Sequence, residues 1–260
     1  KLYYDLGTYT GNASMTSDGR INGNNFLACI TTAQNILKDY PYTGMREEIS
    51  ILLLRAKYKL GSESVLEKKE ERMREAIDEQ ITVIGENRVQ EAESKYDVLD
   101  REVSWHLIGH LQSNKAKKAV RLFDLIHSVD SLALAEAINK AAAAEGKRQD
   151  ILLQVNVAQD ENKFGLEADE MMSVAREVCK MENIRLCGLM TIAPFYEDCE
   201  LARPAFRKLR KLYQELEDAR LEGSDIRYLS MGMTHDFVVA VEEGANLIRV
   251  GTGIFGAREY

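Results

Sequence analysis

The sequence predicts an α/β protein, a single-domain (β/α)8 barrel of the TIM type. Short, continuous apolar runs typical of buried parallel strands recur along the chain, and segments with helical character separate them. Strict alternation of strand and helix implies parallel strands with right-handed crossovers, and eight such strands are the count of a closed barrel. The competing fold, an open doubly wound sheet, has a Gly-rich turn after its first strand, and the first apolar run here lacks one.

The regular pattern follows an irregular N-terminal segment. Residues 1–44 are rich in Gly, Asn, Ser, Thr and Tyr without sustained periodicity, so we expect turns, a mobile arm or a segment added to the natural chain, with no assigned chemistry. The barrel is expected over residues 45–260. Its expected strands are Ile51–Leu54, Ile81–Ile84, Val103–Ile108, Asp124–Ser128, Ile151–Val157, Ile184–Met190, Arg227–Ser230 and Leu247–Val250. The expected helices are Ser64–Glu79, Val89–Tyr96, Ser113–Arg121, Ser131–Glu145, Ala168–Met181, Cys199–Leu221 and Asp236–Glu243.

Residue choice at the helix ends supports these assignments. Ser131 or Asp130 is suited to cap the helix that follows, and Gly146 to close it. Pro204 is best tolerated in the first turns of its helix, because a proline further inside removes a hydrogen bond and clashes with the preceding turn.

The composition bounds the partners and the compartment. The formal net charge is -8, which argues against a nucleic acid held mainly through its phosphates, and the basic cluster Lys115–Lys118 with Arg121 is interpreted as a solvated helix face. Four cysteines without a CxxC pair indicate reduced thiols. Since no apolar run reaches membrane-spanning length and the N-terminus has no signal pattern, we expect a cytoplasmic protein without a membrane partner.

The end of the chain carries a candidate phosphate site. The stretch Arg227–Gly256 contains the last two expected strands, and the second of them runs into Gly251-Thr252-Gly253. Small residues let backbone N–H groups approach an anion, although a lone GxG is also compatible with a simple tight turn. Phosphate sites in barrels are frequent after strands seven and eight, which favours the phosphate interpretation.

Other polar residues follow the expected strands and form a candidate ring at the barrel mouth. Lys57 is its notable member, because a lysine desolvated at an apolar mouth can lose its proton and attack an aldehyde to form a Schiff base. Arg249 lies inside the apolar run Leu-Ile-Arg-Val and needs an acceptor, either a buried carboxylate or a ligand ring nitrogen. The remaining members are Asn87, His110 with Gln112, Ser128 with Asp130, Asn156, Thr191 and Ser230.

Several motifs together resemble the pyridoxal phosphate homeostasis protein family, a single-domain barrel related to the N-terminal domain of alanine racemase. The resemblance covers roughly Gly85 to the C-terminus, with the motifs in the expected order. They are Gly85-Glu-Asn-Arg-Val-Gln-Glu91, Trp105-His-Leu-Ile-Gly109, Leu111-Gln-Ser-Asn-Lys115, Gly188-Leu-Met190, Leu229-Ser-Met-Gly-Met233, Ile248-Arg-Val-Gly-Thr252 and Ile254-Phe-Gly-Ala-Arg258.

The resemblance implies a site for pyridoxal 5′-phosphate (PLP). It assigns Arg249 to the pyridine nitrogen, and a permanent positive charge there disfavours protonation of the ring. It places Asn87 near the ring and implies a Schiff-base lysine after the first strand. The residues that it assigns to the cofactor phosphate are Ser230, Gly232, Met233, Gly251 and Thr252.

The match weakens at the first strand. The family ends this strand with Ala-Val-Ser-Lys-Thr, whereas here it ends Leu54-Arg-Ala-Lys-Tyr-Lys59. Lys57 is the matching position if several residues are inserted before Gly85, and we prefer it to Lys59, Lys68 or no lysine because it directly follows the apolar run. Thr234-His235 is a smaller departure that keeps a hydroxyl.

Three functions remain open from the sequence. The first is PLP binding and delivery without robust turnover. We expect such a protein to be a monomer with PLP and PLP-dependent apoenzymes as partners. This function fits the end of the sequence at Tyr260, which leaves no second domain to supply an opposing tyrosine base. The second is a PLP-dependent amino-acid racemase, for which His110 or Tyr58 would have to serve as the second acid/base. The third is a cofactor-free relic or a different phosphate-binding barrel.

Overall fold

A computed structural model of the 260-residue chain describes residues 77, 81–96, 103–160 and 163–255. Residues Val83–Val250 form one compact unit, and the described segment from Gly251 to Phe255 belongs to a second one. The expected strand Ile51–Leu54, the expected helix Ser64–Glu79 apart from its residue 77, and the expected domain boundary near residue 44 lie outside the described residues.

The compact unit is built on one parallel sheet whose seven strands lie side by side in chain order. They are β1 (Val83–Glu86), β2 (Ser104–Leu107), β3 (Leu125–Val129), β4 (Gln149–Gln154), β5 (Ile184–Met190), β6 (Tyr228–Met233) and β7 (Leu247–Arg249). The described helices are α5 (Val89–Tyr96), α6 (Ala116–Leu122), α7 (Leu132–Ala144), α8 (Met171–Val178), α9 (Arg203–Asp218), α10 (Phe237–Glu242) and α11 (Thr252–Phe255). Two 3-10 turns, η1 (Ser113–Lys115) and η2 (Cys199–Ala202), precede α6 and α9.

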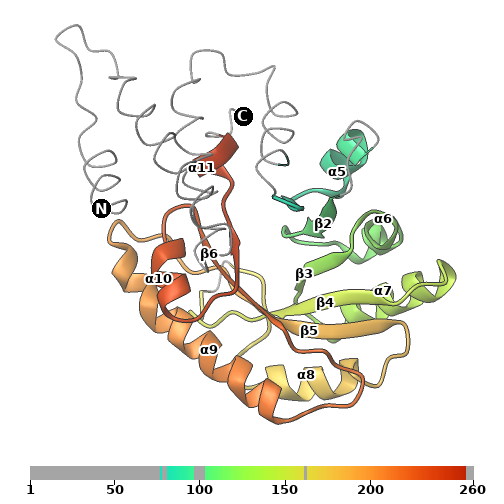
Figure 1. Cartoon of the computed structure of the whole chain (residues 1–260). Helices are drawn as coiled ribbons and strands as arrows, with labels where there is room; N and C mark the ends of the chain where they lie inside the picture. The colour runs from blue at the N-terminus through green and yellow to red at the C-terminus, as the bar shows by residue number, and fades with distance from the viewer. Residues whose placement is uncertain (1–76, 78–80, 97–102, 161–162, 256–260) are drawn as a thin grey trace, which may run out of the picture. The chain divides into compact units, whose positions relative to one another are not determined.

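Strand and helix alternate as expected, and Figure 1 shows the helices of the compact unit along the outside of a curved row of strands. Helix α7 packs on β3 and β4, α8 and α9 pack on β5, and α10 packs on β6 and β7. Sequential parallel strands with a helix after each are the arrangement of a (β/α) barrel, so the predicted fold class is confirmed.

Apolar spacing explains why these segments become helices and strands. In α9 the buried residues Phe206, Leu209, Tyr213 and Leu216 recur at intervals of three and four, which places them on one face of a helix. Burying a large apolar side chain of this kind stabilises the fold by roughly 1.5–3 kcal/mol. The five residues of β3 are all buried, as expected of a parallel strand covered on both faces.

Helix ends follow the predicted caps. The Ser131 hydroxyl accepts a hydrogen bond from the Leu134 N–H at 3.3 Å, and Gly146 after the helix has φ +64°. Pro204 lies in the first turn of α9, where its missing N–H leaves no helical hydrogen bond unmade.

Most expected strands differ from the observed ones by one to three residues at an end, and two of these differences have a structural explanation. The strand predicted over Ile81–Ile84 is observed over Val83–Glu86, because the buried Glu86 carboxylate is paired with the Lys95 ammonium and so tolerates a position inside the sheet. The strand predicted to end at Ser230 continues to Met233, through a register irregularity between these two residues.

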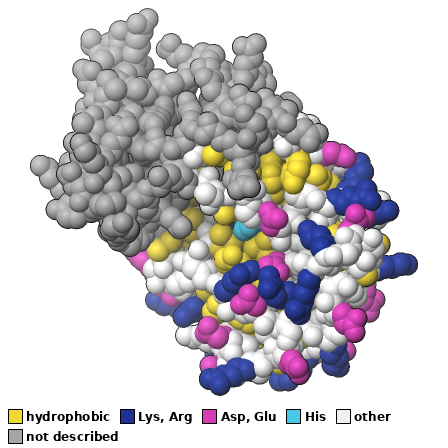
Figure 2. All heavy atoms as spheres, turned by 45° about the vertical axis from the view of Figure 1, so that its right-hand side comes forward, with side chains coloured by type: hydrophobic (Ala, Val, Ile, Leu, Met, Phe, Trp, Pro, Cys, Tyr) yellow, Lys and Arg dark blue, Asp and Glu magenta, His cyan; other side chains and the backbone are white. Residues whose placement is uncertain are grey.

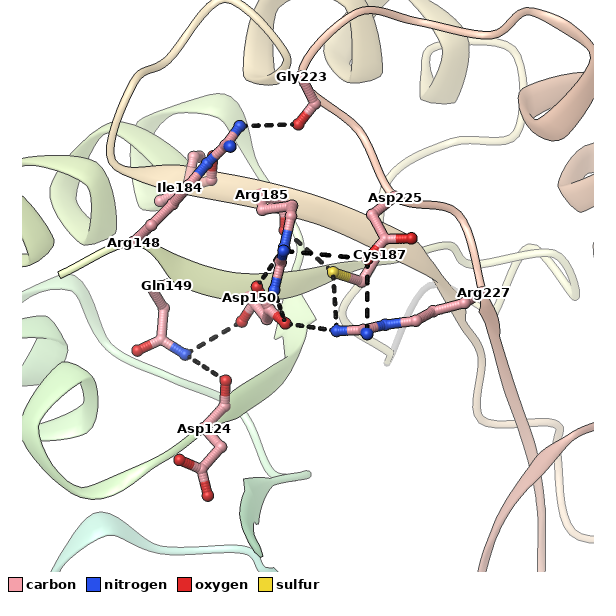
Figure 3. Close-up of polar contacts among 10 residues, drawn as sticks. All are labelled: Asp124, Arg148, Gln149, Asp150, Ile184, Arg185, Cys187, Gly223, Asp225 and Arg227. Carbon is pink, nitrogen blue, oxygen red and sulfur yellow. Dashed lines mark hydrogen bonds and ion pairs between the residues drawn. The ribbon is translucent and has the colours of Figure 1, made fainter.

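The N-terminal ends of β4, β5 and the segment before β6 are joined by ion pairs, as Figure 3 shows. Asp150 accepts two hydrogen bonds from Arg185, each 2.8 Å, and one from Arg227 at 2.7 Å. Beside them the Cys187 thiol is buried, and burial raises its pKa to about 11. These contacts fix neighbouring strands to one another, which makes this end of the barrel a stabilising element.

The described surface carries charges of both signs. Figure 2 shows Lys and Arg side chains intermixed with Asp and Glu on the face in view. Lys117, Lys118 and Arg121 are exposed on α6, where Lys118 pairs with Glu93 and Arg121 with Glu145, so this basic cluster is a solvated helix face as predicted. Cys179, Cys187 and Cys199 are free thiols, and no helix in the described ranges is long and apolar enough to cross a membrane.

Candidate functional site

Arg249 is the centre of a buried polar cluster at the C-terminal ends of β5, β6 and β7. It is the last residue of β7 and is 7% exposed. Its Nη1 donates a hydrogen bond to the Ser230 Oγ at 2.5 Å, and its Nη2 donates one to the Thr191 carbonyl oxygen at 2.7 Å. Thr191 is held in turn, because its hydroxyl donates to the Val155 carbonyl at 2.7 Å.

The strand ending that carries Ser230 requires a glycine. Gly232 has φ +90°, and a Cβ at this position would come within 2.6 Å of the Ala240 Cβ on α10. A glycine thus lets α10 pack closely against the end of β6. The Asp236 carboxylate, just before α10, accepts a hydrogen bond from the Met233 N–H at 2.6 Å and fixes the turn between strand and helix.

Burial of the Arg249 charge dominates the electrostatics of this cluster. Desolvation lowers the pKa of its guanidinium to about 10, and the field of Asp236 opposes that shift. Among the described residues its hydrogen-bond acceptors are a hydroxyl and a carbonyl, both uncharged. The buried carboxylate considered from the sequence is therefore not among these acceptors, and within the described part of the chain no carboxylate is hydrogen-bonded to this cation.

Two histidines that the sequence analysis did not single out complete the cluster. His127 on β3 lies with its Nδ1 3.0 Å from the Ser230 Oγ and its Nε2 3.1 Å from the Nδ1 of His106 on β2. Burial lowers the pKa of His106 to about 4 and that of His127 well below its ordinary value of 6.5. In the sequence, each of these two histidines lies inside an apolar strand. That position indicates a buried polar group, but the prediction considered only polar residues at the strand ends.

The other predicted phosphate residues are distributed over two units. Met233 is exposed at the end of β6, and Gly232 is buried beside it in the same unit. Gly251 and Thr252 belong to the second unit. There the Gly251 carbonyl, just before α11, accepts hydrogen bonds from the N–H groups of Ile254 and Phe255. Lys57, Lys59, Lys68 and Tyr58 lie outside the described residues.

Asn87 is exposed directly after β1, as the sequence predicts. Its backbone lies against Gly109 at the end of the next strand: a Cβ on Gly109 would be 2.2 Å from the Asn87 carbonyl oxygen. The Ser128 hydroxyl donates to the Gly109 carbonyl at 2.6 Å and so holds this glycine from the other side.

The remaining polar residues of the predicted ring connect the loops that follow the strands. His110 Nδ1 lies 3.2 Å from the Asp130 carboxylate, and the His110 ring stacks on Phe164 with centroids 3.7 Å apart. The Asn156 side chain exchanges two hydrogen bonds with the Asp160 backbone.

Lys163 is a described lysine at this end of the barrel. Its ammonium donates a hydrogen bond to the Ala193 carbonyl at 2.8 Å, and burial lowers its pKa. Over the described ranges no group of three or more His, Cys, Asp or Glu is arranged to hold a metal ion.

Comparison with known proteins identifies related chains along most of this sequence. The family profile of the alanine racemase N-terminal domain matches residues 69–259. The pyridoxal phosphate homeostasis protein of Aquifex aeolicus is 45% identical over 181 residues, which cover 69% of this chain and 78% of that protein. The protein of the same name from Escherichia coli K12 is 34% identical over 197 residues, covering 72% of this chain and 80% of that protein.

Solved structures show the same relationship. PipY of Synechococcus elongatus PCC7942, solved with PLP bound, is 39% identical with a TM-score of 0.66, and the match covers 72% of this chain and 87% of PipY. An alanine racemase from Clostridium difficile 630 is 15% identical with a TM-score of 0.58, and the match covers 72% of this chain and 51% of the racemase. The racemase likeness shows the fold alone. The family resemblance indicated by the motifs is confirmed by the family profile and by the relatives above 30% identity.

Proposed function

We propose, because the chain belongs to the pyridoxal phosphate homeostasis protein family, that it binds PLP and takes part in intracellular PLP homeostasis and delivery. The observation that carries the proposal is the buried Arg249 cation, whose hydrogen-bond acceptors in the described structure are neutral. A buried charge is costly unless an opposite charge or strong acceptor compensates it. An anionic ligand with an aromatic nitrogen meets that need.

The donor chemistry of Arg249 fits this ligand. A guanidinium has five N–H donors, and within the described part of the chain two hydrogen bonds engage it. The donors left over are available to a ring nitrogen, and the positive charge of Arg249 disfavours a proton on that nitrogen. PLP supplies an aldehyde that condenses with amines and a pyridine ring whose electron-withdrawing power depends on its protonation. A ring kept unprotonated by Arg249 suits storage and transfer of the cofactor better than demanding carbanion chemistry.

The remaining roles are proposed from the family motifs. Lys57 forms the Schiff base with the aldehyde, and Asn87 lies near the ring. Gly232, Met233, Gly251 and Thr252 bind the phosphate. Ser230 is also assigned to the phosphate by the motifs, but here its hydroxyl is bonded to Arg249.

Two further parts of the proposal concern the cell. We propose a monomer that delivers PLP to PLP-dependent apoenzymes, and we place it in the cytoplasm on the interpretation of its cysteines as reduced thiols. The racemase alternative needs a second acid/base. His110, which was considered for this role, has its Nδ1 3.2 Å from the Asp130 carboxylate and its ring stacked on Phe164. Racemisation of alanine or serine well above the rate with free PLP would favour that alternative.

A ligand titration tests the proposed function. The purified chain is titrated with PLP, with pyridoxal and with inorganic phosphate, and visible absorbance and thermal unfolding are recorded. We expect saturable binding of PLP, a higher melting temperature with PLP, and weaker binding of each partial ligand. The Arg249→Glu variant should bind PLP with an altered visible spectrum, because a carboxylate favours the protonated ring. Absence of saturable PLP binding, or equal affinity for pyridoxal, would contradict the proposal.

A further inference from the structure

A continuous line of four buried side chains runs from β7 to β2. It joins Arg249 to Ser230 over 2.5 Å, Ser230 to His127 over 3.0 Å, and His127 to His106 over 3.1 Å. Their exposed fractions are 7%, 0%, 1% and 6%, in the same order. Water therefore has little access to these groups, and each polar atom depends on its neighbour in the line for a hydrogen bond.

The hydrogen-bonding chemistry of Arg249 determines which atom donates in each bond from Arg249 to His106. Arginine only donates, so the Ser230 Oγ accepts from Arg249. The Ser230 hydroxyl proton then has the His127 Nδ1 as its acceptor at 3.0 Å. If the His127 Nδ1 carried a proton instead, both neighbours would donate to Ser230 and its own buried hydroxyl proton would lose this acceptor. Leaving a buried donor unsatisfied is strongly disfavoured, so the first arrangement holds.

The same reasoning continues through both imidazoles. With its Nδ1 accepting, a neutral His127 carries its proton on Nε2 and donates it to the His106 Nδ1. His106 then carries its own proton on Nε2. The alternative of a charged His127 is opposed by burial and by the nearby His106 and Arg249, which together hold its pKa well below its ordinary value.

We propose that His127 and His106 are positioning residues for Arg249. Both imidazoles are neutral and accept a hydrogen bond at Nδ1, His127 from the Ser230 hydroxyl and His106 from His127. These bonds fix the Ser230 hydroxyl and thereby hold the guanidinium in one orientation. This inference deepens the proposed function and rests on it for the ligand that Arg249 faces. It also reassigns Ser230. Because its hydroxyl proton is committed to His127, Ser230 orients Arg249 and does not donate to the cofactor phosphate.

The proton positions are tested first, on the protein without PLP. The sequence has four histidines, so ¹⁵N-labelled histidine gives a small set of NMR signals that single substitutions assign. Near neutral pH we expect both His127 and His106 as neutral Nε2–H tautomers, and we expect Ser230→Ala to change the Nδ1 signal of His127. An Nδ1–H tautomer or an imidazolium at either residue would overturn the proposal. Because no cofactor is present, this result does not depend on whether the proposed function holds.

The effect on Arg249 is tested by PLP binding to variants of His127. His127→Leu removes the acceptor, and we expect about tenfold weaker PLP binding and a changed visible spectrum. His127→Asn keeps an acceptor near the Nδ1 position and should restore binding to about the wild-type level. Gln149→Leu is the matched control. Gln149 is as deeply buried as His127, but it is the first residue of β4, and its side-chain amide donates to the backbone carbonyls of Asp124 and Asp150.

The variants separate positioning from general destabilisation. We expect Gln149→Leu to lower the melting temperature without changing the spectrum or the affinity for PLP. Wild-type affinity and spectrum in His127→Leu would overturn the proposal, and so would equal losses in His127→Leu and His127→Asn. If the His127 variants fail to fold, the tautomers of the wild-type protein and the PLP spectrum of Ser230→Ala still decide it.

Discussion

The Arg249 guanidinium donates a 2.5 Å hydrogen bond to the Ser230 hydroxyl, and both side chains are buried where two neighbouring strands end. This contact joins a permanent cation to a neutral acceptor. Among the described residues the acceptors of this cation are uncharged. If the proposed ligand compensates the charge, removing the charge should weaken binding without lowering the stability of the ligand-free protein.

Replacing Arg249 by methionine separates these two quantities. Even a buried ion pair can often be replaced by apolar side chains at no loss, or at a gain of about 1–4 kcal/mol, because taking a charge out of water is costly. We therefore expect Arg249→Met to keep or raise the unfolding free energy of the PLP-free protein while weakening PLP binding at least about tenfold. Chemical denaturation and PLP titration measure the two effects.

Arg203→Met is the control for that experiment. Arg203 donates hydrogen bonds to Glu200, Glu242 and Glu243, so its removal leaves three carboxylates close together. The control should lose stability and keep its affinity for PLP. Wild-type PLP affinity in Arg249→Met would contradict the role given to this arginine.

The pH dependence of stability should report the buried histidines. The pKa of His106 is about 4 in the folded chain against an ordinary value of 6.5, so the unfolded chain takes up a proton between these values that the folded chain does not. The contribution of His106 is therefore complete above pH 6.5 and is lost as the pH falls toward 4. At about 1.4 kcal/mol per pH unit the difference amounts to roughly 3 kcal/mol.

Denaturation with urea at several pH values checks this slope. His106→Asn, which does not titrate, should lose less stability than the wild type between pH 7 and pH 4.5. Gln149→Leu also removes a buried polar group but leaves the histidines in place, so its slope should match that of the wild type. Identical slopes for His106→Asn and wild type would show that His106 is not buried as a neutral ring.

A pair of glycines tests how tightly the strands pack. Gly188 on β5 has φ +146°, and a Cβ there would lie 1.8 Å from the Tyr228 carbonyl oxygen of β6. Gly146 after α7 has φ +64° and open space around the same position. We expect Gly146→Ala to destabilise the protein by about 1–2 kcal/mol, from backbone conformation alone. The loss of unfolding free energy in Gly188→Ala should be clearly larger, because the strand must also move. Similar losses in the two variants would contradict the close approach of β5 and β6.

Asp150 tests the separation of a stabilising end from a binding end. It accepts hydrogen bonds from Arg185 and Arg227, and hydrogen bonds to charged groups contribute about 1.5–3 kcal/mol. Since solvent screens the two partly exposed guanidinium groups, the loss of unfolding free energy in Asp150→Asn should lie toward the lower end of that range. The same variant should bind PLP as the wild type does, since these contacts lie at the N-terminal ends of the strands (Figure 3). A change in the PLP spectrum of Asp150→Asn would argue against that separation.

Local patterns made most of the fold predictable. The three- and four-residue spacing of the buried residues in α9, the continuous burial of β3 and the serine cap of α7 each follow from a few neighbouring residues. Boundaries were predicted less well where a long-range contact decides them. The strand was expected to end with the apolar run at Ile84, yet the structure keeps Glu86 inside β1, where Lys95, nine residues later, pairs with its carboxylate.

In the candidate site, too, local sequence predicted some features and long-range contacts determined the others. Arg249 was predicted to need an acceptor because a guanidinium inside an apolar run is costly, but its acceptors come from residues 19 and 58 positions away. His127 meets Ser230 across 103 residues, a contact that no local pattern contains. The sequence thus indicated which charge is buried, and the strand order determined what surrounds it.

The most direct test of the account is to locate the covalent attachment of PLP. The chain is mixed with PLP and reduced with borohydride, and the modified peptide is identified by mass spectrometry, with Lys57→Ala as the comparison. We expect one label, on Lys57, that is absent from the variant. A label on Lys163 or another lysine in the wild type, or no label at all, would contradict the assignment of the cofactor site.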